Sequence, residues 1–304
     1  MRSAPAQLAL EHAFLQSVMY AAVFDYPLTL EQLRQSLIGE TASEEDLAAV
    51  YAGSLELRAA IESRDGFYFP RGRREVIAIR ADREAASHRL LTELAGPLAL
   101  VTRMPFVSMV AVSGSLAHLN GEAQADLDLF VVTRPARVWS VTVTVLALAK
   151  LFGWRERLCL NYVVSERALI VSPADLFSAN QIIHLRPVTG AAAYRRFLDA
   201  NRFVDRFYPN FRQRDLPCCP ERRFTLVERI LDWTLAPLYE RVCRVVYGLH
   251  LRRRAHTWRS RDQVRLEAEC LKLHTASHRY EVMEKFEQAI ASACVQDSRP
   301  ARPA

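Results

Sequence analysis

The residues of this chain best suited to chemistry are two aspartates one residue apart. Asp126 and Asp128 end the stretch SGSLAHLNGEAQADLDLF (113–130), downstream of a Gly-Ser pair. Alternate residues of a strand project to the same face, with Cα atoms about 7 Å apart. Two buried like charges are costly unless a cation lies between them. Because hard oxygen ligands favour Mg²⁺ or Mn²⁺ over Zn²⁺, the pair predicts a site for one of these ions.

The Gly-Ser pair adds an anion-binding element. Gly114 and Ser115 follow the apolar, β-rich run FVSMVAVSG (106–114). A turn between a strand and a helix offers backbone N–H groups and a hydroxyl to an anion. A metal site beside such a turn indicates phosphate chemistry on a nucleotide.

The whole motif resembles the signature of the DNA polymerase β-like nucleotidyltransferase superfamily. Val112-Ser113-Gly114-Ser115 is followed, after ten residues, by Asp126-Leu127-Asp128-Leu129, and the resemblance covers residues 105–185. It implies a polymerase β-like core of mixed sheet and helices, in which Gly114 and Ser115 bind the triphosphate of an NTP. It also implies that Asp126 and Asp128 bind Mg²⁺ (or Mn²⁺), and that NMP is transferred to an unknown acceptor with release of pyrophosphate.

The sequence departs from the superfamily pattern on the next central strand, LCLNYVV. Many members carry a third carboxylate there, whereas this chain has Asn161, which alternation places on one face with Cys159 and Val163. Asparagine accepts a hydrogen bond or offers a neutral oxygen but takes no proton. Three alternatives stay open. Asn161 completes a catalytic site that works with two carboxylates; Glu166 or Asp175 substitutes; or the domain is a nucleotide-sensing regulator with weak catalysis.

The N-terminal part of the chain predicts a winged-helix-like domain over residues 1–95. An amphipathic helix over 6–23 precedes a capping box opened by Thr29, a second helix start at Ser43, and a tight turn at Asp65-Gly66. The helix that would enter DNA begins Glu44-Glu45-Asp46, which phosphates would repel. Packing or partner docking is therefore favoured over DNA reading, although Arg71, Arg73 and Arg74 lie beyond the hairpin.

The remaining boundaries are a nucleotidyltransferase core over 96–188, an all-α C-terminal domain over 189–296 and a flexible tail over 297–304. In the core, the apolar run 138–149 predicts a buried helix, 168–172 a strand and 173–185 a helix. In the C-terminal domain, the pattern predicts a long helix over 224–251 and shorter helices near 262–274 and 278–294.

Charge is distributed unevenly. The net charge is +6, but residues 1–185 carry −3 (17 Lys+Arg, 20 Asp+Glu) and residues 186–304 carry +9 (23 and 14). The basic C-terminal part suggests an anionic partner: nucleotide, nucleic acid or acidic lipid. Arginines interleaved with His256 and Trp258 in LRRRAHTWRSR (251–261) fit phosphate binding and base stacking as well as they fit a solvated helix end.

Composition points to a folded, reducing-compartment protein. Of 304 residues, 50% are hydrophobic and 24% charged, as in globular proteins. The six cysteines form no C-x-x-C pair and no leader is recognised, so reduced thiols in the cytoplasm and no membrane span are expected. His274 and His278 are four residues apart on an expected helix, where a solvated face is favoured over a metal site.

Overall fold

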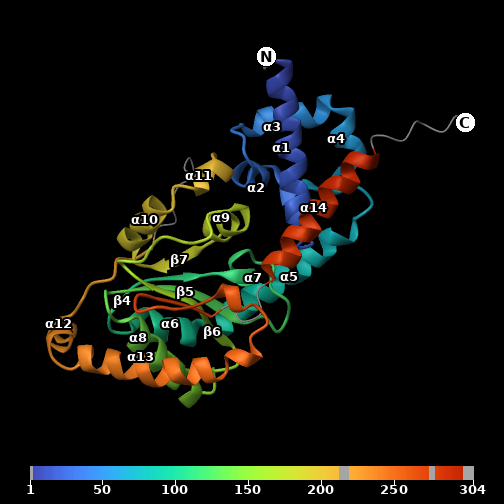
Figure 1. Cartoon of the computed structure of the whole chain (residues 1–304). Helices are drawn as coiled ribbons and strands as arrows, with labels where there is room; N and C mark the ends of the chain where they lie inside the picture. The colour runs from blue at the N-terminus through green and yellow to red at the C-terminus, as the bar shows by residue number, and fades with distance from the viewer. Residues whose placement is uncertain (1–2, 212–218, 274–277, 297–304) are drawn as a thin grey trace, which may run out of the picture.

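The protein has a mixed α/β fold built on two β-sheets. The computed structural model describes residues 3–211, 219–273 and 278–296. Figure 1 shows the N-terminal helices in blue on one side of a larger central sheet and the long orange helix α13 (Ala236–Arg253) on the other side. The mixed α/β class expected from the sequence is confirmed at this level.

The N-terminal region combines short helices with a small antiparallel sheet. Its elements are α1 (Ala4–Ala22), β1 (Leu28–Thr29), α2 (Leu30–Gln35), α3 (Glu44–Gly53), α4 (Leu55–Ala60), β2 (Ile61–Arg64) and β3 (Phe67–Pro70). Thr29 and Ser43 each begin a helix with a complete capping box. Asp65 and Gly66, both with positive φ, form the turn between β2 and β3. These helix starts and the hairpin are confirmed, and the winged-helix-like assignment of residues 1–95 stays a prediction.

The central sheet has the strand order β7-β4-β5-β6-β9-β8, in which β8 (Val264–Leu266) and β9 (Cys270–Leu273) come from the C-terminal part of the chain. The elements leading through it are α5 (Glu75–Glu93), α6 (Ala95–Arg103), β4 (Val107–Val112), α7 (Gly114–Ala117), β5 (Leu127–Thr133), α8 (Val138–Leu151), β6 (Leu158–Ser165), α9 (Leu176–Ile183) and β7 (Arg186–Thr189). Only β5 and β6 pair in parallel; the other neighbouring strands are antiparallel. Helix α8 connects the parallel pair, as a parallel connection requires.

Helix α8 is the buried helix expected from its apolar sequence. Trp139 is buried, and its backbone N–H and that of Ser140 donate to Glu240 of α13 at 3.0 and 2.7 Å. The first N–H groups of a helix have no partner within it, so Glu240 satisfies two of them from another helix. Within the described residues, no helix combines the length and apolarity needed to cross a membrane.

The C-terminal part is not all-α, contrary to the expectation for residues 189–296. Its elements are α10 (Ala191–Ala200), α11 (Val204–Phe207), α12 (Leu226–Trp233), α13 (Ala236–Arg253), two 3₁₀ turns (Ala255–Thr257 and Arg261–Gln263), β8 (Val264–Leu266), β9 (Cys270–Leu273) and α14 (Arg279–Gln296). The helix expected near 262–274 is wrong because β9 pairs with β6 and carries β8 on its other edge. Leu271 of β9 is fully buried in the core beneath the sheet.

Three smaller expectations also need correction. Residues 168–172 form no strand; their backbone is held by Asn201, which accepts from the Val171 N–H at 2.8 Å and donates to the Leu169 carbonyl at 2.8 Å. The helix expected from 173 begins only at Leu176, because Asp175 is its N-cap. The long helix expected over 224–251 is divided into α12 and α13, with Pro237 in the first turn of α13.

Side chains on β6 change face partway along the strand. Its pairing with β5 shifts register between Asp128 and Phe130. Cys159, opposite Asp128, lines a cavity, whereas Val163 packs in the core on the other face of the sheet. The expectation that Cys159 and Val163 share a face with Asn161 is therefore wrong. Asn161 lies at the irregularity; its side chain is outside the described part of the structure.

Candidate active site

The Gly-Ser turn and the aspartates meet where β4 ends and β5 begins. These strands are antiparallel, and the N–H of Ser113 donates to the carbonyl of Asp128 at 2.8 Å. Gly114 has φ +64°, and a methyl group on it would come within 3.1 Å of the Asp128 Cγ and closer still to Oδ2. Any side chain at this position would therefore displace the carboxylate. The turn must be glycine for Asp128 to occupy its place.

Both aspartates reach one cavity of ≈ 730 Å³. Asp126 directly precedes β5 and is exposed, Leu127 between them is fully buried, and Asp128 is half-buried in the strand. Gly114 and Ser115 line the same cavity. The structure thus brings together the four residues that the sequence predicts for phosphate and metal.

The pKa of Cys159 shows how the two aspartates affect the part of the cavity next to them. It pairs with Asp128 across the parallel strands and lines the cavity. Burial, followed by the negative charges of Asp128 and Asp126, raises the pKa of its thiol to about 12. The two carboxylates therefore act on one small, partly desolvated volume, where a cation would be favoured.

Neither of the alternative third carboxylates is brought to the cavity. Glu166 pairs with Arg196 at 2.8 Å. Asp175 caps α9, accepting from the Ser178 N–H at 2.9 Å, and forms an ion pair with Arg279. Neither residue is among the described residues lining the cavity.

Much of the cavity wall comes from residues outside the Gly-Ser and aspartate motif. Tyr20 and Phe24 come from α1 and the turn after it, Asn180 from α9, Tyr208 from the segment after α11, and Val282 from α14. None carries a sequence signal of its own. Each is an ordinary apolar or amide residue whose role depends on how distant helices pack.

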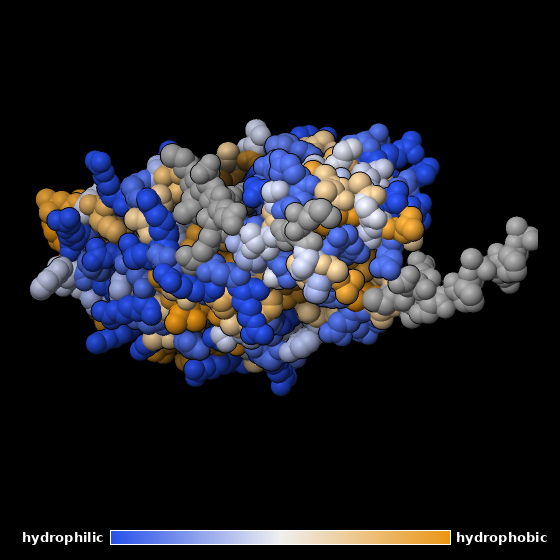
Figure 2. Space-filling model, turned by 90° about the horizontal axis from the view of Figure 1, so that it is seen from above, coloured by the Kyte–Doolittle hydropathy of each residue, from blue (hydrophilic) through white to orange (hydrophobic). Residues whose placement is uncertain are grey.

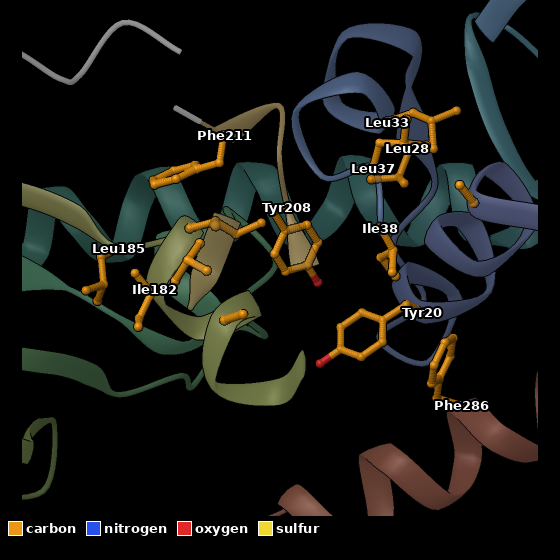
Figure 3. Close-up of a cluster of buried hydrophobic side chains, with 14 of the residues drawn as sticks. Tyr20, Leu28, Leu33, Leu37, Ile38, Ile182, Leu185, Tyr208, Phe211 and Phe286 are labelled. Carbon is orange, nitrogen blue, oxygen red and sulfur yellow. The ribbon is translucent and has the colours of Figure 1, made fainter. Parts of the chain in front are cut away.

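Tyr20 stands out in this wall. Its side chain is 3% exposed, and its hydroxyl is buried with no hydrogen-bond partner among the described residues. Tyr208 faces it, and the Tyr208 hydroxyl accepts from Asn180 Nδ2 at 3.1 Å. Figure 3 shows the two tyrosines pointing their hydroxyls toward one another from different elements. An unpartnered buried hydroxyl costs about 1–3 kcal/mol, so Tyr20 is an unsatisfied polar group in the wall of the cavity.

Two histidines close another side of the cavity. The rings of His118 and His184 lie 3.9 Å apart between centroids. Burial, and then the positive charges of His184 and Arg186, hold the pKa of His118 well below its usual value. His118 is therefore neutral at physiological pH. Nearby, Asn120 donates from Nδ2 to the Phe24 carbonyl at 2.9 Å, which fastens the loop after the Gly-Ser turn to the end of α1.

The donor set suits Mg²⁺ or Mn²⁺ but is small. Among the described residues, no group of three or more His, Cys, Asp or Glu side chains is arranged to hold a metal ion. Mg²⁺ is commonly held by one or two carboxylates together with substrate phosphates and water, and Asp126 with Asp128 meets that pattern. His274 lies outside the described residues, and His278, which lines the cavity, pairs with Glu281 at 3.5 Å.

Comparison of the chain with protein-family models, with curated proteins and with solved structures returned no match. The fold class is mixed α/β.

Proposed function

We propose that the protein is a Mg²⁺-dependent nucleotidyltransferase of the DNA polymerase β-like type, transferring NMP from an NTP to an acceptor. One observation carries the proposal: the Gly-Ser turn and both aspartates line a single cavity, and a Cβ atom on Gly114 would collide with the Asp128 carboxylate. The volume of ≈ 730 Å³ is in the range of small-molecule sites.

Different residues would bind the phosphates and the metal ion. Gly114 and Ser115 would hold the triphosphate through backbone N–H groups and a hydroxyl, while Asp126 and Asp128 would hold Mg²⁺. The bound Mg²⁺ would supply charge stabilisation to the phosphates. An acceptor oxygen forms a bond to the α-phosphorus, the α–β phosphoanhydride bond breaks, and pyrophosphate leaves with the electron pair. The acceptor proton passes to solvent, since Glu166 and Asp175 are bonded elsewhere.

The acceptor would occupy the part of the cavity that Tyr20, Phe24 and Tyr208 line. There Tyr20 offers the unpartnered hydroxyl and Phe24 and Tyr208 offer aromatic walls. Such a wall suits a compact acceptor with apolar surface and at least one polar group. The proposed winged-helix-like region would thus serve in substrate enclosure rather than in reading DNA.

The structure offers little support for DNA contact by the N-terminal arginines. Arg73 pairs with Asp25 at 2.8 Å and Arg74 pairs with Glu62 at 2.7 Å. Arg71 donates from Nε to the Ala59 carbonyl at 3.0 Å. All three are engaged within the fold, so they give no support for a DNA-binding role of the N-terminal region.

The second candidate is a nucleotide-sensing regulator. It is favoured by Asn161, which stands where a third carboxylate is common, and by the engagement of Glu166 and Asp175 in other contacts. Such a protein would bind Mg²⁺ and NTP at the same residues without turnover.

The test compares two double variants for transfer of label from each α-labelled NTP, with Mg²⁺ and cell extract as acceptor source. We expect Asp126→Asn/Asp128→Asn to lower labelling about 100-fold or more. The matched control Asp82→Asn/Asp199→Asn removes two exposed aspartates away from the cavity and keeps wild-type activity. Mg²⁺-dependent NTP binding without any transfer would replace the transferase by the regulator. If the wild type neither binds nor transfers any of the four NTPs, both proposals fail.

A further inference from the structure

Helices α12 and α13 present a continuous apolar surface to solvent. Nine large apolar side chains on them are each at least half exposed, among them Leu226, Ile230, Trp233, Leu238, Val242 and Leu249. Trp233 is 91% exposed. On α13 these positions recur at intervals of four and seven residues, so they share one face. Figure 2 shows hydrophobic side chains gathered at the end of the molecule where Figure 1 places α12.

The same helices are basic where they are not apolar. Exposed arginines accompany the apolar face at Arg229, Arg241, Arg244, Arg252, Arg253 and Arg254. The acidic residues between 226 and 254 are Glu228, Asp232 and Glu240, and each is used inside the fold. Glu228 pairs with Arg222 at 2.7 Å, Asp232 with Arg137 at 2.6 Å, and Glu240 caps α8.

We propose that α12 and α13 form a docking surface for an anionic lipid bilayer. An apolar helix face flanked by arginines, with an exposed tryptophan, is the pattern of a helix lying in the membrane interface. Anionic headgroups satisfy the arginines, and the acyl boundary accepts the apolar side chains.

A second copy of the chain fits this surface less well. A two-fold dimer places the same face on both partners, so arginines would oppose arginines. Among the described residues of these helices, no acid is left over to pair with them. Nucleic acid would satisfy the arginines but leave the exposed leucines and Trp233 in water.

Docking in this way leaves the candidate active site accessible. Helix α13 packs on α8, in the core on one face of the central sheet. The cavity opens on the other face, where α1, α9 and α14 contribute its wall. The lipid surface and the cavity would thus lie on opposite sides of β5 and β6, and the inference does not depend on the proposed function.

The experiment is flotation of the purified full chain with two kinds of vesicle: phosphatidylcholine alone, and phosphatidylcholine with an equal amount of phosphatidylglycerol. We expect about tenfold more protein bound to the anionic vesicles, with binding that weakens as NaCl is raised. Leu226→Asp/Leu238→Asp should abolish flotation. The control Leu8→Asp/Leu55→Asp changes two equally exposed leucines of the N-terminal region and should leave flotation intact.

The charge requirement is tested separately with Arg241→Glu/Arg252→Glu, which should lower binding to anionic vesicles about tenfold or more. Arg89→Glu/Arg103→Glu is the matched control at exposed positions elsewhere. Absence of wild-type flotation would overturn the proposal, as would equal loss in variants and controls that all keep the wild-type melting temperature. A wild-type dimer that Leu226→Asp/Leu238→Asp converts to a monomer would show instead that a second copy covers the face.

Discussion

At the scale of single residues, the close approach of Gly114 to the Asp128 carboxylate requires glycine at position 114. Gly114→Ala adds a methyl group within 3.1 Å of the Asp128 Cγ, in a backbone with φ +64°. We expect it to displace the carboxylate and to weaken Mg²⁺-NTP binding about tenfold or more, because misplacement of a site group by about 1 Å is expensive. A fluorescent NTP titrated in the presence of Mg²⁺ measures the loss.

The control for this substitution is Gly72→Ala. Gly72 also has positive φ, +84°, but nothing lies within 4 Å of the position a methyl group would take. Both variants should lose about 1–2 kcal/mol of stability from the left-handed backbone, and only Gly114→Ala should lose nucleotide. Equal binding by the two variants would show that the position of Asp128 does not matter to the ligand.

His118 makes the stability of the folded protein depend on pH, and the direction of the effect follows from its pKa. Its pKa in the folded state lies well below its usual value of 6.5, because it is buried beside His184 and Arg186. Below about pH 6.5 the unfolded chain binds a proton that the folded chain does not. Stability from this residue is therefore complete at higher pH and falls as the pH drops below about 6.5, by up to about 1.4 kcal/mol per pH unit.

Urea unfolding at about pH 7.5 and about pH 5.5 tests this. When the pH is lowered from the first value to the second, the free energy of unfolding should fall more for the wild type than for His118→Gln, because glutamine does not titrate. His88→Gln, at an exposed helix position, should behave like wild type. If His118→Gln is as pH-sensitive as wild type, His118 is protonated in the folded protein.

At the scale of elements, α14 is part of the N-terminal region although it is last in the chain. Its Phe286 is buried and stacks edge-on against Tyr20 of α1, with ring centroids 5.1 Å apart. Phe286→Ala should lower the free energy of unfolding by about 3–5 kcal/mol, measured by urea unfolding. The exposed Gln288→Ala should change it by less than about 0.5 kcal/mol. A small effect of Phe286→Ala would mean that α14 is not docked on α1.

The elements that the sequence predicts correctly are those fixed by neighbouring residues. The side chains of Thr29 and Ser43 each bond the backbone N–H of the residue three positions later, which bonds back to the cap. The turn of the hairpin at Asp65-Gly66 is set by the backbone angles of these two residues. The Gly-Ser turn and the aspartates belong to this group too, because the antiparallel pairing of β4 with β5 brings them together within about 15 residues of chain.

The elements that the sequence does not predict depend on distant partners. Residues 264–273 have helix-forming composition, yet they form β8 and β9 because the edge of β6 accepts another strand. The face of Cys159 depends on one irregularity between β5 and β6. Tyr20 belongs to the cavity only because α1 and α9 lie on the same side of the sheet. Propensity and periodicity do not contain this information.

At the scale of the whole molecule, the cavity joins regions that the sequence divides into separate domains. Its wall combines the end of α1, the turn after β4, α9 and α14. A Mg²⁺-NTP complex with a non-cleavable α–β linkage should therefore slow amide hydrogen exchange in residues 113–128, which it contacts. It should also slow exchange in residues 17–26 and 177–184, because Asn120 donates to the Phe24 carbonyl and the His118 ring lies against the His184 ring. Exchange in α13, on the other face of the sheet, should not change. Mass spectrometry of peptides from the labelled chain measures each segment. Protection confined to 113–128 would show that nucleotide binding at the motif does not stabilise the helices that wall the rest of the cavity.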